Sequence, residues 1–143
     1  MKFKGYLIFH LNLAFSSIEE ESQASVIRDC YHPLLNLIEE TKIPIGIELT
    51  GWTLNRILQI DRNWVIRFKK LLNSGACELI GSGYCQTIGP LATFHVNKWN
   101  QRLGFEYYEN TLAVKPNIAY VNEMVFSQSM VNLYDQFNYK AII

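Results

Sequence analysis

Hydrophobic and polar positions alternate along the chain in two patterns, which predict strands and helices in strict succession. Short β-prone runs bounded by turn residues indicate strands, and apolar residues three or four positions apart indicate amphipathic helices. The predicted strands are Tyr6 to Leu11, Ile45 to Leu49, Cys77 to Ile80, Ile118 to Val121 and Tyr139 to Ile143. The predicted helices are Ser22 to Lys42, Trp52 to Ile60, Trp64 to Leu72, Phe94 to Leu112 and one that ends at Phe137.

Three residues carry local signals for helix boundaries. Asp61 has the side chain of a helix cap and precedes the helix from Trp64, and Ser127 has the same property before the last helix. Pro33 interrupts the first helix, because proline lacks the backbone N–H that a helix interior uses. We therefore expect that helix to kink or restart there.

The order of elements predicts an α/β fold with a parallel sheet and right-handed crossovers. Four strand–helix units and a fifth strand make more than half of a barrel. We expect a partial parallel (β/α)7-type barrel of about five strands, truncated after the fifth, in one domain over residues 1–143. An open five-stranded sheet is the alternative. Because unpaired apolar edges are avoided, the strand ending at Ile143 predicts either a further part of the barrel or self-association through this edge.

Composition and charge narrow the function classes. The 143 residues are 49% hydrophobic and 18% charged, as in a globular domain. Thirteen basic and thirteen acidic residues cancel, and no Lys/Arg stripe indicates a nucleic-acid surface. No run approaches a membrane span, and the N-terminal apolar run is too short for a signal peptide, so we expect a cytoplasmic protein. Cys30 and Cys77 are expected to be buried thiols, which fits a reducing compartment.

Polar residues gather where the predicted strands end. In a parallel barrel these ends share one rim, and catalytic groups collect there. Glu123 is the most informative, because a carboxylate at the end of an apolar strand is badly placed for packing and well placed for chemistry. The strand-end residues are His10, Asn12, Glu48, Ser82, Gln86, Asn122 and Glu123.

Four collinear segments resemble family 57 glycoside hydrolases. Ala76 to Tyr84, after Leu71 to Gly75, is similar to that family's "leucine-rich helix, Ser-Gly, Glu-Leu, Gly-x-Gly-Tyr" stretch. Pro116 to Ser127 is similar to the block that holds the catalytic nucleophile. Glu48 to Gly51 resembles the second-strand block, and Phe137 to Ile143 resembles the strand after the nucleophile helix.

The resemblance implies an incomplete (β/α)7 barrel that acts with retention on α-glucans or related α-linked sugars, by hydrolysis or glucan transfer. It places Glu123 at the nucleophile position, and we expect His10, Glu48, Gln86 and Asn122 to bind substrate. A retaining mechanism also needs a general acid/base. In the family this Asp lies on a later strand, beyond Ile143, so the isolated chain is expected to be inactive.

The chain departs from the family pattern at two places. The family's first strand usually ends in His-Gln-Pro, whereas His10 is followed here by Leu11-Asn12. Gln86 stands where the family usually has Glu or His. Both differences leave the sugar specificity open.

Two other function classes remain open. One is a partial barrel that binds carbohydrate, or serves a structural role, without chemistry. The other is a polysaccharide deacetylase-like enzyme, which needs an Asp and two His on one helical face, but His95 is followed at i+4 by Trp99. We therefore expect no metal and no cofactor. A Gly-x-Ser-x-Gly nucleophile elbow is also absent from the sequence.

Overall fold

The computed structural model describes residues 5–143, which form a five-stranded sheet with every neighbouring pair of strands parallel. The strands lie in the sheet in the order in which they follow along the chain. Their bounds are β1 Leu7–Leu11, β2 Ile45–Leu49, β3 Glu78–Gly81, β4 Ile118–Ala119 and β5 Ala141–Ile142. The predicted α/β fold with five parallel strands is therefore confirmed, although β4 and β5 are shorter than predicted.

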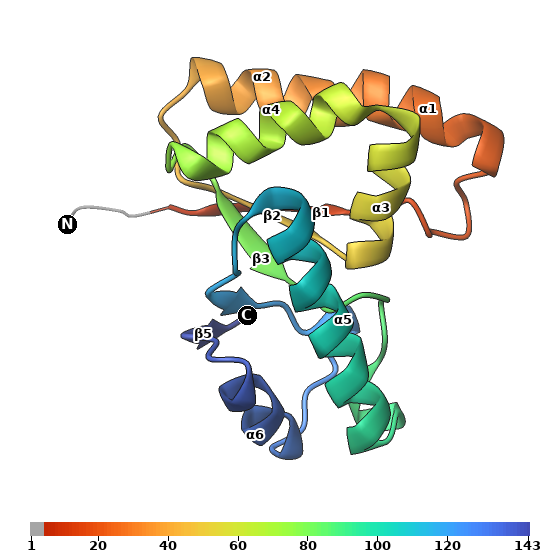
Figure 1. Cartoon of the computed structure of the whole chain (residues 1–143), viewed down its shortest axis with the longest axis vertical. Coiled ribbons are helices and arrows are strands. Elements are labelled where there is room, and N and C mark those ends of the chain that lie inside the picture. The colour runs from red at the N-terminus through yellow and green to blue at the C-terminus, as the bar shows by residue number, and fades with distance from the viewer. Residues whose placement is uncertain (1–4) are drawn as a thin grey trace.

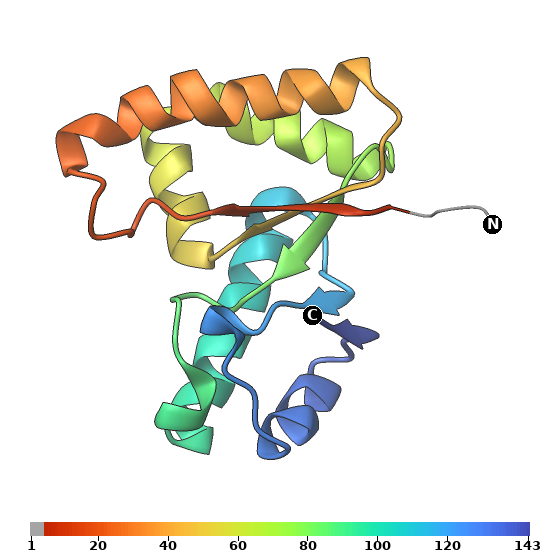
Figure 2. The ribbon, with the colours of Figure 1, turned by 180° about the vertical axis from the view of Figure 1, so that it is seen from behind.

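Helices connect each strand to the next and cover the outer face of the sheet (Figure 1). In both ribbon views α2 and α4 lie side by side over β1 and β2, and α5 runs past the end of β3 (Figures 1 and 2). The helices are α1 Gln23–Val26, α2 His32–Glu40, α3 Gly51–Ile60, α4 Arg62–Asn73, α5 Phe94–Leu112 and α6 Ser129–Gln136. Single-turn segments are the 3-10 turns Glu20–Ser22, Gly89–Leu91 and Asn122–Met124, and the π-helical turn Ile27–Tyr31.

The helix boundaries confirm one predicted cap and contradict another. The Asp61 carboxylate accepts hydrogen bonds from the backbone N–H groups of Asn63 at 3.0 Å and Trp64 at 3.2 Å, and α4 begins directly after it. The prediction for Ser127 is wrong, because α6 begins at Ser129 and no side chain caps it. The Ser127 hydroxyl instead lies 2.8 Å from the hydroxyl of Ser129, so it is not directed at a backbone N–H.

The first long helix continues through Pro33 by way of the π-helical turn Ile27–Tyr31. Pro33 stands in the first turn of α2, where a missing N–H is tolerated. The wide turn keeps Ile27 and Tyr31 buried and leaves Cys30 exposed. The expectation of a buried Cys30 is therefore wrong, whereas Cys77 is buried.

The central strand β2 is buried along its whole length, and its two faces differ in character. Ile45, Ile47 and Leu49 face the helices and belong to the main hydrophobic core. Successive residues of a strand point to opposite faces, so Glu48 lies on the inner face of the curved sheet. A smaller apolar cluster lies beneath β4 and β5, and it consists of Ala119, Val121, Met130, Leu133 and Tyr134.

Two contacts hold α5 against the strand ends. The fully buried Tyr108 hydroxyl donates to the Leu49 carbonyl at 2.6 Å and lies 3.0 Å from the Gly83 carbonyl. Gly104 lets the helix approach the loop after β3, since a Cβ there would come within 2.5–2.8 Å of backbone atoms of Gly83 and Tyr84. Helix α5 thereby fixes the loop that leads to Gln86.

No helix among residues 5–143 is long and apolar enough to cross a membrane.

Gly104→Ala is expected to destabilise the protein by about 1–3 kcal/mol, because the added methyl group meets backbone that cannot move aside without shifting the loop. On an exposed helix surface the same change would be stabilising. Urea unfolding followed by circular dichroism measures the effect. The control is Asn110→Ala, an exposed position of the same helix, expected to change the free energy of unfolding by less than about 0.5 kcal/mol. Equal stability of Gly104→Ala and wild type would contradict the close contact.

Candidate active site

A cleft of about 630 Å³ opens at the rim, where β1 and β4 end and the loop after β3 passes. Its polar lining residues are His10, Asn12, Gln86 and Glu123. Its other lining residues are Phe15, Ile18, Val26, Cys30, Tyr31, Tyr120 and Met124. The cleft therefore has a polar side next to the strand ends and a largely apolar wall formed by the loop after β1 and the first long helix.

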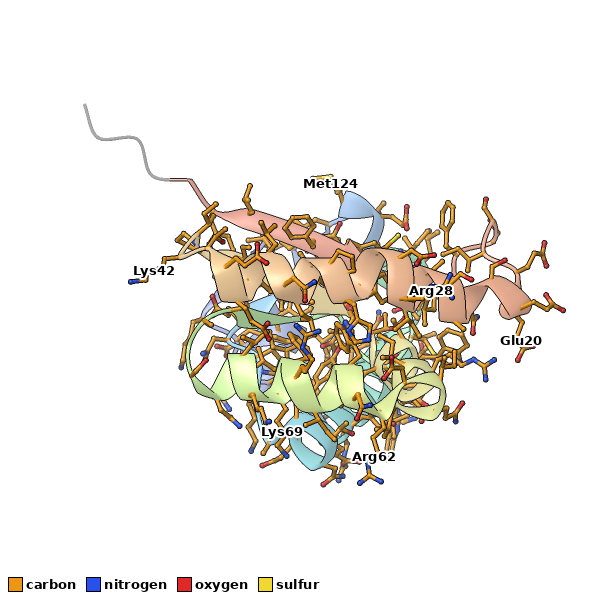
Figure 3. The ribbon with its side chains drawn as sticks, turned by 90° about the horizontal axis from the view of Figure 1, so that it is seen from above. Glu20, Arg28, Lys42, Arg62, Lys69 and Met124 are labelled. Atoms are coloured by element: carbon orange, nitrogen blue, oxygen red, sulfur yellow. The ribbon has the colours of Figure 1, made fainter. Side chains whose placement is uncertain are left out.

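Glu123 lies on the strained turn Asn122–Met124, which is separated from the end of β4 by two residues. Its φ is 56° and that of Met124 is 54°, so two consecutive residues other than glycine adopt the left-handed conformation. Each such residue costs of order 1–3 kcal/mol, and backbone strain of this kind clusters at functional sites. Figure 3 shows Met124 at the edge of the molecule, and 85% of its surface is exposed. Burial of Met124 therefore does not offset the strain.

A chain of amide hydrogen bonds orients the Glu123 carboxylate. Gln86 Nε2 donates to Glu123 Oε1 at 2.6 Å, and Asn12 Nδ2 donates to Gln86 Oε1 at 2.5 Å. The three residues come from the segments that follow β4, β3 and β1. Because the amide donates to Glu123, the carboxylate is bound as an acceptor, which is what its ionised form requires.

His10 and Glu48 form a pair across β1 and β2. The two residues are partners in the parallel register, so their side chains leave the sheet on the same face and at the same level. Glu48 Oε2 lies in close hydrogen-bond contact with His10 Nδ1, and Glu48 is fully buried. The His10 ring stacks on Tyr120, with ring centroids 5.7 Å apart.

The surroundings of His10 favour its charged form. The hydrogen bond to Glu48 is the largest effect and raises the pKa of the imidazole above 6.5. Partial burial lowers the pKa, and the negative charges of Glu48 and Glu123 raise it further. The net direction is upward, so the imidazole beside Glu123 binds a proton more readily than a free histidine does.

The five residues predicted from sequence separate into two groups. His10, Gln86 and Glu123 line the cleft together. Glu48 and Asn122 are buried behind it, with Asn122 donating from Nδ2 to the Ser82 carbonyl at 3.3 Å. Glu48 and Asn122 can therefore support the lining residues, but neither reaches the cleft surface.

Asn12 and Tyr120 also line the cleft, although neither is predicted from sequence as a binding residue. Each lies two positions from a predicted site residue, Asn12 from His10 and Tyr120 from Asn122. The period of two along an extended segment is the signal that could have identified Asn12. It does not identify Tyr120, because Asn122 is buried behind the cleft.

Among the described residues 5–143, no group of three or more His, Cys, Asp or Glu side chains is arranged to hold a metal ion. The polar side chains of the cleft are instead suited to hydroxyl groups, since amides and the imidazole donate and the carboxylate accepts.

Glycosyl hydrolase family 57 matches the chain over residues 6–143. Among solved structures, an alpha-amylase from Thermotoga maritima superposes with a TM-score of 0.82 and 16% identity, over 99% of this chain and 39% of that one. A 4-alpha-glucanotransferase from Thermococcus litoralis superposes with a TM-score of 0.79 and 14% identity, over 98% of this chain and 22% of that one. A CE4 family pseudoenzyme from Bacillus anthracis superposes with a TM-score of 0.70 and 13% identity, over 96% of this chain and 42% of that one.

At these identities the structural likeness establishes the fold alone. The chain spans less than half the length of each of these three proteins. A search of curated protein sequences finds no match.

Met124→Gly is expected to stabilise the protein by roughly 1 kcal/mol, because glycine adopts a positive φ without strain and the exposed side chain gives up little packing. Thermal and urea unfolding provide the measurement. The control, Gln128→Gly, alters an exposed residue with φ −56° and is expected to destabilise by about 0.5–1 kcal/mol. A loss of stability in Met124→Gly as large as in the control would argue against backbone strain at this turn.

Proposed function

The chain belongs to glycosyl hydrolase family 57, and on that basis we propose that its cleft is part of the active site of a retaining glycoside hydrolase or glucanotransferase. The substrates are α-linked glucans or related polysaccharides. Glu123 is the nucleophile, and its Oε atom attacks the anomeric carbon of the bound sugar.

The observation that carries this proposal is the setting of Glu123. Its carboxylate lies at the mouth of the sheet, on a strained turn, and is oriented by the Gln86 amide. A nucleophile needs to be ionised and fixed in direction before the substrate arrives. His10, whose pKa is raised in part by the negative charge of Glu123, lines the same cleft.

The sugar hydroxyls contact His10, Gln86 and Asn12, since these are the polar side chains that line the cleft beside Glu123. Tyr120 offers an aromatic surface to the sugar ring. Glu48 and Asn122 act from behind the lining, in line with their burial.

The second carboxyl group of the mechanism lies outside these residues. A retaining glycosidase needs two carboxyl groups about 5–5.5 Å apart, one to attack and one to protonate the leaving oxygen. Among the described residues that line the cleft, Glu123 is the one carboxylate. We place the general acid/base on a later strand of the family's barrel, so the 143-residue chain alone turns over natural substrates slowly or not at all.

The two edge strands support the presence of further barrel elements. Within residues 5–143, β1 and β5 are the outer strands of the sheet, and both expose apolar side chains. Leu7, Ile8, Ile142 and Ile143 are each more than a third exposed. Further strands of the same barrel would cover these edges, and self-association of two chains is the alternative.

A second candidate function is carbohydrate binding without turnover. It is favoured by the single carboxylate in the cleft, because one carboxyl group can hold a sugar but cannot complete a retaining mechanism.

Covalent trapping tests Glu123 as nucleophile in the 143-residue chain itself. Fluoride leaves an α-glucosyl fluoride without being protonated, so the missing acid is not needed. Incubation with 5-fluoro-α-D-glucosyl fluoride is expected to join the sugar to Glu123 as the C–F bond breaks, because the second fluorine slows hydrolysis of the ester. Peptide mass spectrometry locates the added sugar.

Glu123→Gln is expected to abolish this labelling, whereas Glu21→Gln, at an exposed carboxylate far along the chain, is expected to leave it unchanged. Labelling of another residue, or none on Glu123, would refute the nucleophile assignment. Calorimetric binding of maltooligosaccharides without labelling would favour the second candidate.

A further inference from the structure

Glu48 is a carboxylate in a place where an unpaired charge would be costly. It is 0% exposed, and among the described residues its Oε1 atom has no hydrogen-bond partner. Its other oxygen is in close contact with His10 Nδ1. Because a buried carboxylate is tolerated when paired with a positive group, the pairing with His10 accounts for its presence inside the sheet.

We propose that Glu48 is a positioning residue for His10, which it holds in one orientation so that the opposite edge of the imidazole presents an N–H group to the cleft beside Glu123. The proposal rests on the function proposed above, since it assigns Glu48 a role in the same site. Glu48 acts through His10 and does not touch the sugar.

The geometry determines which ring nitrogen faces which side. A carboxylate can only accept a hydrogen bond, so the nitrogen facing Glu48, Nδ1, carries a proton. Nε2 lies on the far edge of the ring, and His10 is one of the residues that line the cleft. Stacking on Tyr120 restricts rotation of the ring about its bond to Cβ. The ring is therefore held on two sides.

The charges around His10 favour the form in which both ring nitrogens are protonated. Glu48 faces it from β2, and Glu123 faces it from the turn after β4. Tyr120 lies against its face, and Cys30 and Tyr31 line the same wall from the π-helical turn. Of these groups the two carboxylates, Glu48 and Glu123, both raise the pKa of the imidazole. A charged N–H donates a stronger hydrogen bond to a sugar hydroxyl than a neutral group does.

The same arrangement indicates the charge of the substrate. Glu48 and Glu123 bring two carboxylates to this part of the site, which disfavours acidic sugars. The site therefore suits a neutral glycoside whose hydroxyl accepts a hydrogen bond from His10 and donates one to Glu123.

Nuclear magnetic resonance of the 143-residue chain, with nitrogen-15 in the imidazole rings, tests the assignment directly. The chain contains three histidines, His10, His32 and His95, so their signals can be assigned from single substitutions. At pH 7 we expect both nitrogens of His10 to be protonated, with Nδ1 in a strong hydrogen bond. An unprotonated Nδ1 at this pH would overturn the proposal, and this measurement needs no substitution of Glu48.

Substitution separates the two carboxylates. Glu48→Gln keeps the shape of the side chain and removes its charge, so the titration midpoint of His10 is expected to fall toward 6.5. Glu123→Gln is expected to lower the midpoint less, because Glu123 acts through charge alone. Glu21→Gln serves as the control and leaves the midpoint unchanged. An unchanged midpoint in Glu48→Gln would show that Glu48 does not set the state of His10.

Stability provides an independent measurement. Because the pKa of His10 is higher in the folded than in the unfolded chain, the contribution of the pair is complete below about pH 6.5 and is lost as the pH rises through the folded-state pKa. The free energy of unfolding is expected to fall across this window in wild type and not in Glu48→Gln. A parallel fall in both proteins would contradict the pairing.

The rate at which Glu123 is labelled by the fluoro sugar distinguishes positioning from a general structural role. If Glu48 acts through His10, Glu48→Gln slows labelling in the wild-type background and adds nothing in a His10→Gln background. Equal slowing in both backgrounds would refute the proposal. Absence of labelling in every protein would instead refute the proposed function, while the His10 spectrum would still decide the role of Glu48.

Discussion

The parallel register between β1 and β2 is the constraint on which the site depends. It sets His10 opposite Glu48 on the inner face of the sheet and sets Phe9 opposite Ile47 on the face that packs against the helices. A slip of one residue would turn every side chain of β1 to the other face and leave Glu48 as a buried charge without a partner. The buried Tyr108 hydroxyl is bonded to the end of β2 and to the Gly83 carbonyl, so it holds α5 and the loop after β3 in a fixed position relative to β2.

The arrangement of strands and helices follows closely from the sequence, and its exceptions have identifiable causes. Helix α5 has the bounds that its spacing predicts, because it is long and ends before Pro116. The π-helical turn before α2 is not recognisable in the apolar pattern, since it spans only five residues and the pattern resumes in α2. Ser127 resembles a helix cap in sequence. Whether its side chain reaches a backbone N–H depends on where the chain leaves β4, and β4 is only two residues long.

The sequence predicts which residues gather at the rim of the sheet, but it does not predict how deeply each side chain is buried. The rule that parallel strands end at one rim places His10, Gln86 and Glu123 together, and in the structure the three line one cleft. The period of two shows which face a side chain occupies, but it does not show how far down that face the side chain lies. Glu48 and Asn122 therefore seemed equivalent to the lining residues, although the structure buries both. The positive φ at Glu123 has no sequence signature, because neither it nor Met124 is a glycine.

The π-helical turn determines which residues of the segment before α2 face the cleft. Such a turn is equivalent to one residue inserted into an α-helix. Deletion of one residue between Ile27 and Tyr31 would restore the regular repeat and rotate the preceding segment by about 100° relative to α2. Val26 and its neighbours would then leave the cleft, while α2 would keep its packing on α4. Natural length variation at this turn is therefore a route by which related chains could reshape the apolar side of the cleft and keep the same sheet.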